Sequence, residues 1–244
     1  MNLFVPLFKR EFMGYFRSPV AYVFTIIFLL ASVGCTFFIG GLYESNQASL
    51  QTFFMFLPWL FLVLVPAIGM RLWAEERRSG TIELLFTLPV TVEEAVLAKF
   101  MAGWAFLAIT ILLTFPLVLT VNFLGDPDNG VIVAGYIGSI LMAGAYLAIA
   151  SLTSALTKNQ VVSFILGVVV SFVLVLVGWG IFTSILSSFL PVPVVDAVAS
   201  LGFMSHFTPV TRGVVDLRDV VYFLMVIGVA LAMNVVVIDS RKAS

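Results

Sequence analysis

The chain alternates between long apolar runs and short polar connections. Six runs are free of Asp, Glu, Lys and Arg and are long enough, at 1.5 Å per residue, to cross about 30 Å of hydrocarbon as helices. They cover residues 20–43, 52–70, 100–124, 131–156, 161–188 and 220–238. The pattern predicts an all-α integral membrane protein with six transmembrane helices.

The fifth apolar run is longer than one crossing requires, because no charge occurs until Asp196. Pro191 and Pro193 are expected to break the fifth helix, since proline lacks the N–H that continues a helix. We therefore assign residues 189–218 to a separate segment before the last span, with a short helix over residues 194–201.

Small residues crowd the fourth apolar run. Gly135 with Ser139, and Gly144 with Ala148, fit the small-xxx-small spacing that lets membrane helices approach closely. We expect these positions to serve packing within the chain.

The composition agrees with a membrane protein and excludes several other classes. Hydrophobic residues make up 61% and charged residues 10%, against roughly 25% charged in soluble domains. The net charge of −1 gives no indication of nucleic-acid binding, and a single cysteine, Cys35, excludes a disulfide framework within the chain. With one histidine and no acidic residue inside a span, a proton-coupled carrier or a membrane enzyme is disfavoured.

Lys and Arg residues fix the predicted orientation, because cytoplasmic loops retain positive charge. With the N-terminus inside, ten fall on the cytoplasmic side, namely Lys9, Arg10, Arg17, Arg71, Arg77, Arg78, Lys99, Lys158, Arg241 and Lys242. Only Arg212 and Arg218 fall outside. Both termini are therefore predicted to be cytoplasmic.

Residues 1–18 are predicted to form an amphipathic helix in the membrane interface. Aromatic and aliphatic side chains at helical spacing are expected to face lipid, and three basic side chains to face the headgroups. The apolar set is Phe4, Leu7, Phe8, Phe12 and Phe16, and the basic set is Lys9, Arg10 and Arg17.

The largest polar feature is the stretch MRLWAEERRSGTIELLFTLPV at residues 70–90. The chain has 12 Lys and Arg and 13 Asp and Glu residues, and six of these lie between Arg71 and Glu83. Ser79 is expected to cap a short helix that starts at Gly80 or Thr81, buries an apolar face and stops before Pro89. An ordinary polar loop is the alternative.

Four segments resemble ABC-2 type transporter permeases, and more narrowly their gliding-motility (GldF-like) subfamily. They are FKREFMGYFRSPVAYV at 8–23, MRLWAEERRSGTIELLFTLPVTVEEAVLAKF at 70–100, SLTSALTKNQVVSFIL at 151–166, and HFTPVTRGVVDLRDVVYFL at 206–224. The second carries a pattern of acidic and basic residues, Gly-Thr, Glu and Pro-Val, followed by the lysine before the next span.

The resemblance implies a six-span half-transporter, comparable to type V exporters, that pairs with a second copy or a related permease. Two copies of a separate ATP-binding subunit would bind the ATP and Mg²⁺, and this chain would be no enzyme, in line with the lack of a phosphate-binding G-x-x-x-x-G-K-[ST] loop. The loop between spans 2 and 3, residues 71–98, would hold a cytoplasmic coupling helix docking onto that subunit. The docking set is Glu75, Glu76, Arg77, Arg78, Gly80, Thr81, Ile82, Glu83, Leu85 and Phe86.

The outer segment holds a second candidate contact. Five residues there either anchor the last span at the interface or dock a periplasmic or membrane-anchored auxiliary subunit. They are His206, Arg212, Asp216, Arg218 and Asp219.

The predicted function is the permease subunit of an ATP-driven exporter surrounded by membrane lipids. The alternative is a mechanotransmission subunit that passes ATPase motion to an outer partner without moving a solute.

Overall fold

A computed structural model describes residues 4–44, 48–82 and 90–240, and within these ranges the regular structure is helical with no strand. The helices are α1 (Phe4–Arg17), α2 (Pro19–Gly34), a π-helical turn (Cys35–Ile39), α3 (Gln51–Gly69), α4 (Arg71–Ser79), α6 (Val92–Leu112), α7 (Phe115–Leu124), α8 (Asn129–Leu156), α9 (Gln160–Val177), α10 (Gly180–Leu186), α11 (Val192–Ala199), α12 (Phe203–Thr211) and α13 (Leu217–Ser240).

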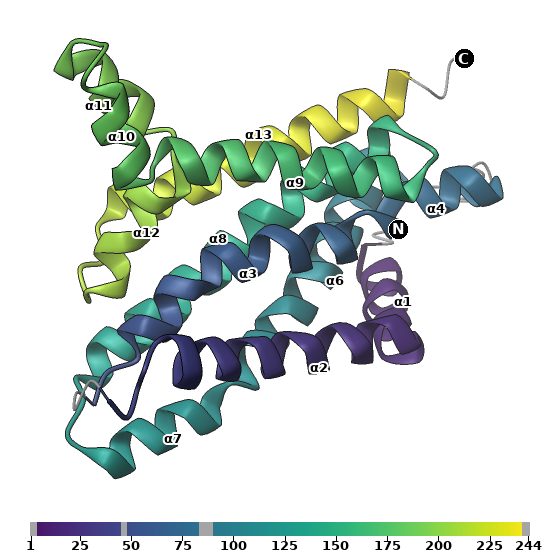
Figure 1. Ribbon diagram of the computed structural model, residues 1–244. Helices are drawn as coiled ribbons and strands as arrows, with labels where there is room; N and C mark the ends of the chain where they lie inside the picture. The colour runs from purple at the N-terminus through teal and green to yellow at the C-terminus, as the bar shows by residue number, and fades with distance from the viewer. Residues whose placement is uncertain (1–3, 45–47, 83–89, 241–244) are drawn as a thin grey trace.

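Six helical segments in the described part of the chain are long and apolar enough to cross a membrane, as the sequence predicted. They are α2 with the π-helical turn, α3 with α4, α6 with α7, α8, α9 and α13. Figure 1 shows them running between the same two ends of the molecule, with α1 turned aside from α2. The chain is a multi-pass membrane protein.

Helix α8 forms the centre of the bundle. It packs against α3, α4, α6, α9, α12 and α13. Its small residues allow this close packing, as predicted. A side chain at Gly135 would collide with the ring of Phe54, and one at Gly144 would collide with Trp104.

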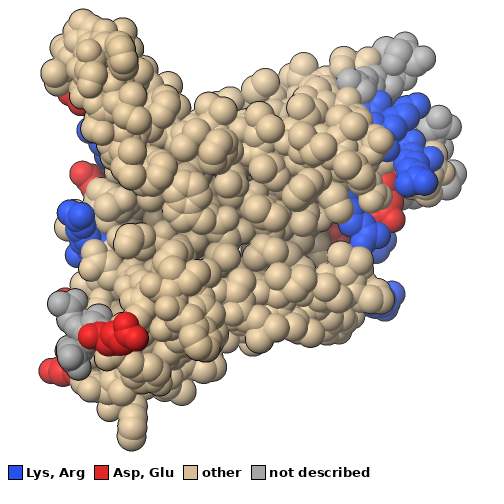
Figure 2. Space-filling model, in the orientation of Figure 1, with Lys and Arg blue, Asp and Glu red and all other residues tan. Residues whose placement is uncertain are grey.

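Charged side chains gather at the two ends of the bundle and leave the middle apolar (Figure 2). We call the end that carries α1 and α4 the basic end, because eight of the described Lys and Arg residues come from the segments that meet there. They are Lys9, Arg10, Arg17, Arg71, Arg77, Arg78, Lys99 and Lys158. At the opposite end, Arg212 follows α12 directly and Arg218 lies in the first turn of α13.

Helix α1 packs more closely on the bundle than the sequence indicated. Leu7 is buried, and Phe4 and Phe8 pack against the core instead of facing lipid. The ring of Tyr15 stacks on Phe106 of α6, with 4.9 Å between the ring centroids. The amphipathic face of α1 is therefore covered in part by α6.

The fifth span ends at Val177, before the prolines that were expected to end it. The break falls where Gly178 meets Gly202, and a Cβ atom on Gly202 would collide with the backbone of Gly178. Pro191 and Pro193 instead stand at the start of α11, where proline is tolerated because the first N–H groups of a helix have no partner within it.

Candidate functional site

The charged stretch after the second span is itself a helix, α4, which continues α3 past Met70. It ends at Gly80, whose left-handed φ of 74° suits glycine. Ser79 is the last residue of α4, and its hydroxyl donates back to the carbonyl of Glu75 over 2.9 Å. Ser79 and Gly80 therefore end α4, and the expectation that Ser79 caps the following helix is wrong. Thr81 and Ile82 are helical again, which agrees with the expected helix start at Thr81.

Ser154 of α8 joins α4 to the core. Its hydroxyl accepts hydrogen bonds from the backbone N–H groups of Trp73 and Ala74, at 3.0 and 2.9 Å, and donates to the carbonyl of Met70 at 2.8 Å. The first N–H groups of a helix have no partner within it. One buried serine thus satisfies backbone groups at the junction of α3 and α4, and we call it the Ser154 junction.

A second serine of α8 lies close by. Ser151 accepts hydrogen bonds from the indole N–H of Trp73, at 3.2 Å, and from the side-chain amide of Asn234 in α13, at 2.7 Å. These contacts link α4, α8 and α13 through buried polar groups, although the side-chain oxygen of Asn234 has no hydrogen-bond partner among the described residues.

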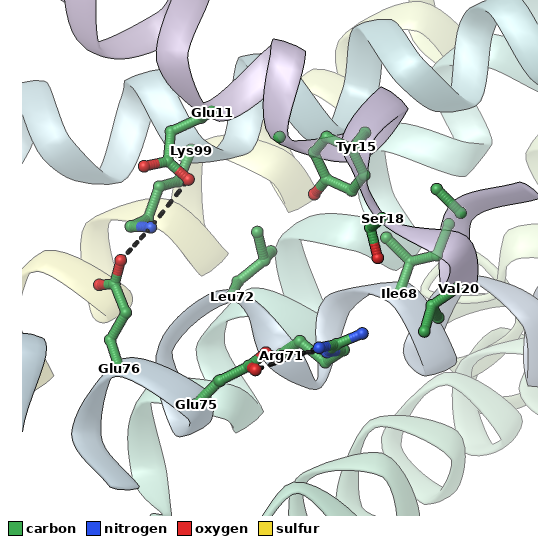
Figure 3. A pocket seen from close by; sticks show the side chains of 12 residues that line it. Glu11, Tyr15, Ser18, Val20, Ile68, Arg71, Leu72, Glu75, Glu76 and Lys99 are labelled. Carbon is green, nitrogen blue, oxygen red and sulfur yellow. Dashed lines mark hydrogen bonds and ion pairs between the residues drawn. The ribbon is translucent and has the colours of Figure 1, made fainter. Parts of the chain in front are cut away.

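Lys99 holds α1, α4 and α6 together at the basic end. Its ammonium lies 3.0 Å from a carboxylate oxygen of Glu11 in α1 and 2.7 Å from one of Glu76 in α4 (Figure 3). Its side chain is only 3% exposed, and the ammonium is 5.4 Å from the ring centre of Trp73. A buried charge of this kind requires paired opposite charges. We call Lys99, Glu11 and Glu76 the Lys99 triad.

The first turn of α6 explains where Lys99 lies. The Thr91 hydroxyl accepts from the N–H of Glu94, and the Glu94 carboxylate accepts from the N–H of Thr91. This capping box starts α6 at Val92, before the apolar run begins at Phe100. Lys99 is therefore two turns inside the helix instead of opening it.

The other charges of α4 divide between internal and exposed positions. Arg71 pairs with Glu75 through two hydrogen bonds of 2.8 and 3.1 Å, and Arg77 donates to the carbonyl of Ala155. Arg78 is exposed. Of the predicted docking set, Glu75, Glu76 and Arg77 thus have partners inside the chain.

The rest of that set lies at or beyond the tip of α4. Gly80 and Thr81 are exposed, and Ile82 is partly buried against the core. Glu83, Leu85 and Phe86 lie outside the described residues. We use the name α4 tip for residues 78–81, which form the exposed part of the predicted docking set.

A cavity of about 320 Å³ lies between α1, α2, α3, α4 and α6 at the basic end. Figure 3 shows Glu11, Lys99 and Glu76 along one side and the Arg71–Glu75 pair along another. The cavity is lined by Glu11, Gly14, Tyr15, Ser18, Val20, Ala21, Ile68, Arg71, Leu72, Glu75, Glu76 and Lys99.

The carboxylate of Glu11 responds to opposing influences. Burial raises the pKa of this carboxyl group. The charge of Lys99 and hydrogen bonds from Arg10 and Lys99 lower the pKa by more than burial raises it, so the pKa lies below its ordinary value. Glu11 is therefore ionised at neutral pH and compensates the charge of Lys99.

At the opposite end, the predicted outer contact separates into a buried pair and exposed charges. His206 Nδ1 lies 2.7 Å from an Asp219 carboxylate oxygen, and its Nε2 donates to the carbonyl of Ser200 over 2.9 Å. Both side chains are buried, so they join α12 to α13 within the chain. Arg212, Asp216 and Arg218 are exposed.

Sequence reasoning missed Glu11, Tyr15 and Ser154, which complete the arrangement at the basic end. The positions of Glu11 and Lys99 are 88 residues apart, and no local pattern pairs them. A usable signal was the Thr91-x-x-Glu94 capping box, which places Lys99 inside a helix.

Comparison with known proteins places the chain in a family. The family model described as ABC-2 family transporter protein matches residues 41–207, which is more than half of the 244 residues. No curated protein matches the chain. The chain belongs to the ABC-2 transporter family, whose membrane components are typically non-enzymatic and work with an ATP-binding partner.

Proposed function

We propose that this ABC-2 family chain is the permease subunit of an ATP-driven exporter, with the basic end in the cytoplasm of a bacterium. The observation that carries the proposal is the construction of α4. The helix is joined to the core by the Ser154 junction and the Lys99 triad, while the α4 tip is exposed.

This construction suits a helix on which a soluble subunit pushes. A load applied at the α4 tip passes through Trp73 and Ala74 to Ser154 of α8, the helix that contacts most of the bundle. The same load passes through Glu76 and Lys99 to α6. Rigid packed elements transmit displacement in this way, because packed cores deform little.

Several finer features of the proposal rest on the resemblance to gliding-motility permeases. The complex contains a second copy of this chain or a related permease and two ATP-binding subunits, with Glu83, Leu85 and Phe86 completing the docking set. On the other side of the inner membrane, the exposed Arg212, Asp216 and Arg218 are available to an auxiliary subunit.

The test is to coexpress the chain with its cognate ATP-binding subunit and measure copurification and ATP hydrolysis. We expect the purified chain alone to hydrolyse no ATP and the complex to do so. Arg78→Glu should reduce copurification at low salt more than at high salt, because exposed charges are screened over a Debye length of about 10 Å at 0.1 M. Arg212→Glu at the opposite end is the matched control and should copurify normally.

A second variant tests the residues beyond the tip. Replacing Leu85 and Phe86 with alanine should release the ATP-binding subunit if these side chains anchor it, since a buried side chain of this size contributes roughly 1.5–3 kcal/mol. Wild-type copurification of both this variant and Arg78→Glu would overturn the docking proposal. Hydrolysis by the complex without movement of any lipid or solute would instead support mechanotransmission.

A further inference from the structure

The cavity beside the Lys99 triad has hydrogen-bond donors that nothing in the described chain uses. The Ser18 hydroxyl caps no backbone group, although Ser18 is the residue before α2. Tyr15 also lines the cavity, and burial, with the charge of Glu11, raises the pKa of its phenol, so that it keeps its proton. Both residues lie across the cavity from Arg71 (Figure 3).

Arg71 supplies further donors. Its Nε and Nη2 atoms are directed to Glu75. A guanidinium has five N–H groups, so Nη1 stays available to an oxyanion beside the hydroxyls of Tyr15 and Ser18. Arginine and hydroxyl donors together suit a phosphate group.

The cavity also offers carboxylates to a cation. Three of them, from Glu11, Glu75 and Glu76, line it together with two basic side chains, Arg71 and Lys99. Arg10, outside the lining, lies 2.6 Å from Glu11, so the charges around the cavity balance and suit a ligand without net charge. A ligand with both a phosphate and an ammonium group complements this arrangement better than a plain anion.

The remaining wall is apolar and continues into the membrane spans. Val20 and Ala21 belong to the first turn of α2, and Ile68 to the last turn of α3. Val20 is 46% exposed on the surface of the first span. The volume of about 320 Å³ lies at the lower end of the roughly 300–1,000 Å³ typical of ligand sites, which suits a headgroup whose chains stay in the bilayer.

We propose that this cavity binds the phosphoethanolamine headgroup of a membrane lipid. The phosphate lies beside Tyr15, Ser18 and Arg71, the ammonium lies among the carboxylates of Glu11 and Glu75, and the acyl chains run along Val20. The bound lipid bridges α1 to the end of α3 and the start of α4. The proposal does not depend on the exporter function, because it concerns the chain by itself in a bilayer.

The experiment uses the full chain in nanodiscs that contain equal amounts of phosphatidylethanolamine and phosphatidylcholine. Lipids that stay bound after release into detergent are identified by native mass spectrometry. We expect phosphatidylethanolamine to be enriched roughly tenfold, the ratio that about 1.4 kcal/mol of differential binding gives. The Tyr15→Phe, Ser18→Ala double variant should retain less of both lipids, because these hydroxyls contact the phosphate that the two lipids share.

Tyr22→Phe is the matched control. Tyr22 is 54% exposed, and its hydroxyl donates to the carbonyl of Phe16 outside the cavity lining. Because Tyr15→Phe keeps the ring that stacks on Phe106, thermal unfolding of both variants should stay near wild type. Equal retention of the two lipids by wild type, or an unchanged amount of retained lipid in the double variant, would overturn the proposal.

A second arm separates a lipid from a soluble ligand of the same chemistry. Millimolar phosphoethanolamine should leave the retained lipid in place, since the acyl chains add apolar contacts that the free compound lacks. Binding of free phosphoethanolamine with no enrichment of the lipid would overturn the assignment to a membrane lipid.

Discussion

At the scale of single residues, Lys99 is the most consequential charge in the described chain. It lies at the basic end with carboxylates from two other helices as partners. Removing one partner of a buried ionic group is strongly destabilising, because the remaining charge stays buried without compensation. The Lys99 triad therefore fixes the relative positions of α1, α4 and α6.

The low pKa of Glu11 gives this contact a pH dependence. A carboxyl group whose pKa is lower in the folded state stabilises the fold above its unfolded value of about 4.3, and this contribution is lost as pH falls through the folded value. We expect the difference in thermal stability between wild type and Glu11→Gln to be full at pH 7 and to shrink as the pH falls below about 4.3.

Glu93→Gln is the control for this prediction. Glu93 is exposed in the first turn of α6 and makes no ion pair among the described residues. A stability difference between wild type and Glu11→Gln that does not shrink on acidification would contradict the role assigned to Glu11. The measurement is unfolding in detergent, followed by intrinsic fluorescence across the pH series.

At the scale of elements, the Ser154 junction decides whether α4 is a rigid extension of the bundle. Ser154→Ala leaves the N–H groups of Trp73 and Ala74 buried without an acceptor, at a cost of roughly 1–3 kcal/mol for each unsatisfied group. We expect a lower unfolding temperature and faster proteolysis after Arg77 and Arg78.

Ser32→Ala provides the comparison. Ser32 is equally buried, but its hydroxyl donates only to the carbonyl of Leu29 in its own helix. Its loss should change the unfolding temperature little. Equal effects of the two substitutions would mean that Ser154 contributes no more than an ordinary buried serine.

The sequence predicted the number of spans because a membrane helix must satisfy its own backbone, which leaves a long uncharged run as its signature. It did not predict α4, although the Arg77-Arg78-Ser79-Gly80 order is typical of a helix end, with basic residues followed by glycine. The prediction treated these charges as a loop because charge usually indicates solvent exposure.

Contacts between distant elements explain the remaining misses at the site. Glu76 was expected to meet a soluble partner, yet it faces Lys99. Likewise, the end of the fifth span depends on the approach of Gly178 to Gly202, which neither glycine shows in its local sequence. Local patterns predict elements, whereas these positions are determined by packing between them.

At the scale of the whole molecule, the segregation of charge to two ends predicts how the bundle sits in the membrane. In a Cys35→Ala background, a cysteine at Asp128 should react with an impermeant thiol reagent added to intact cells. Cysteines at Ser79 and Lys158, both exposed at the basic end, should react only after the membrane is opened.

Labelling after lysis serves as the control, because all three positions must then react. External labelling at Lys158 would contradict both the six-span arrangement in the membrane and the cytoplasmic position of the basic end. Labelling at none of the three positions in intact cells would contradict the external location of residue 128.

The Ser154 junction also has a consequence for the order of events during synthesis. The hydroxyl that accepts from Trp73 is 81 residues further along the chain. At about 5–20 residues per second, the ribosome needs roughly 4–16 s to reach Ser154 after Trp73 has been made. Throughout that interval the N–H groups of Trp73 and Ala74 lack their acceptor. The start of α4 can therefore be held against the bundle only after the fourth span has entered the bilayer beside the second.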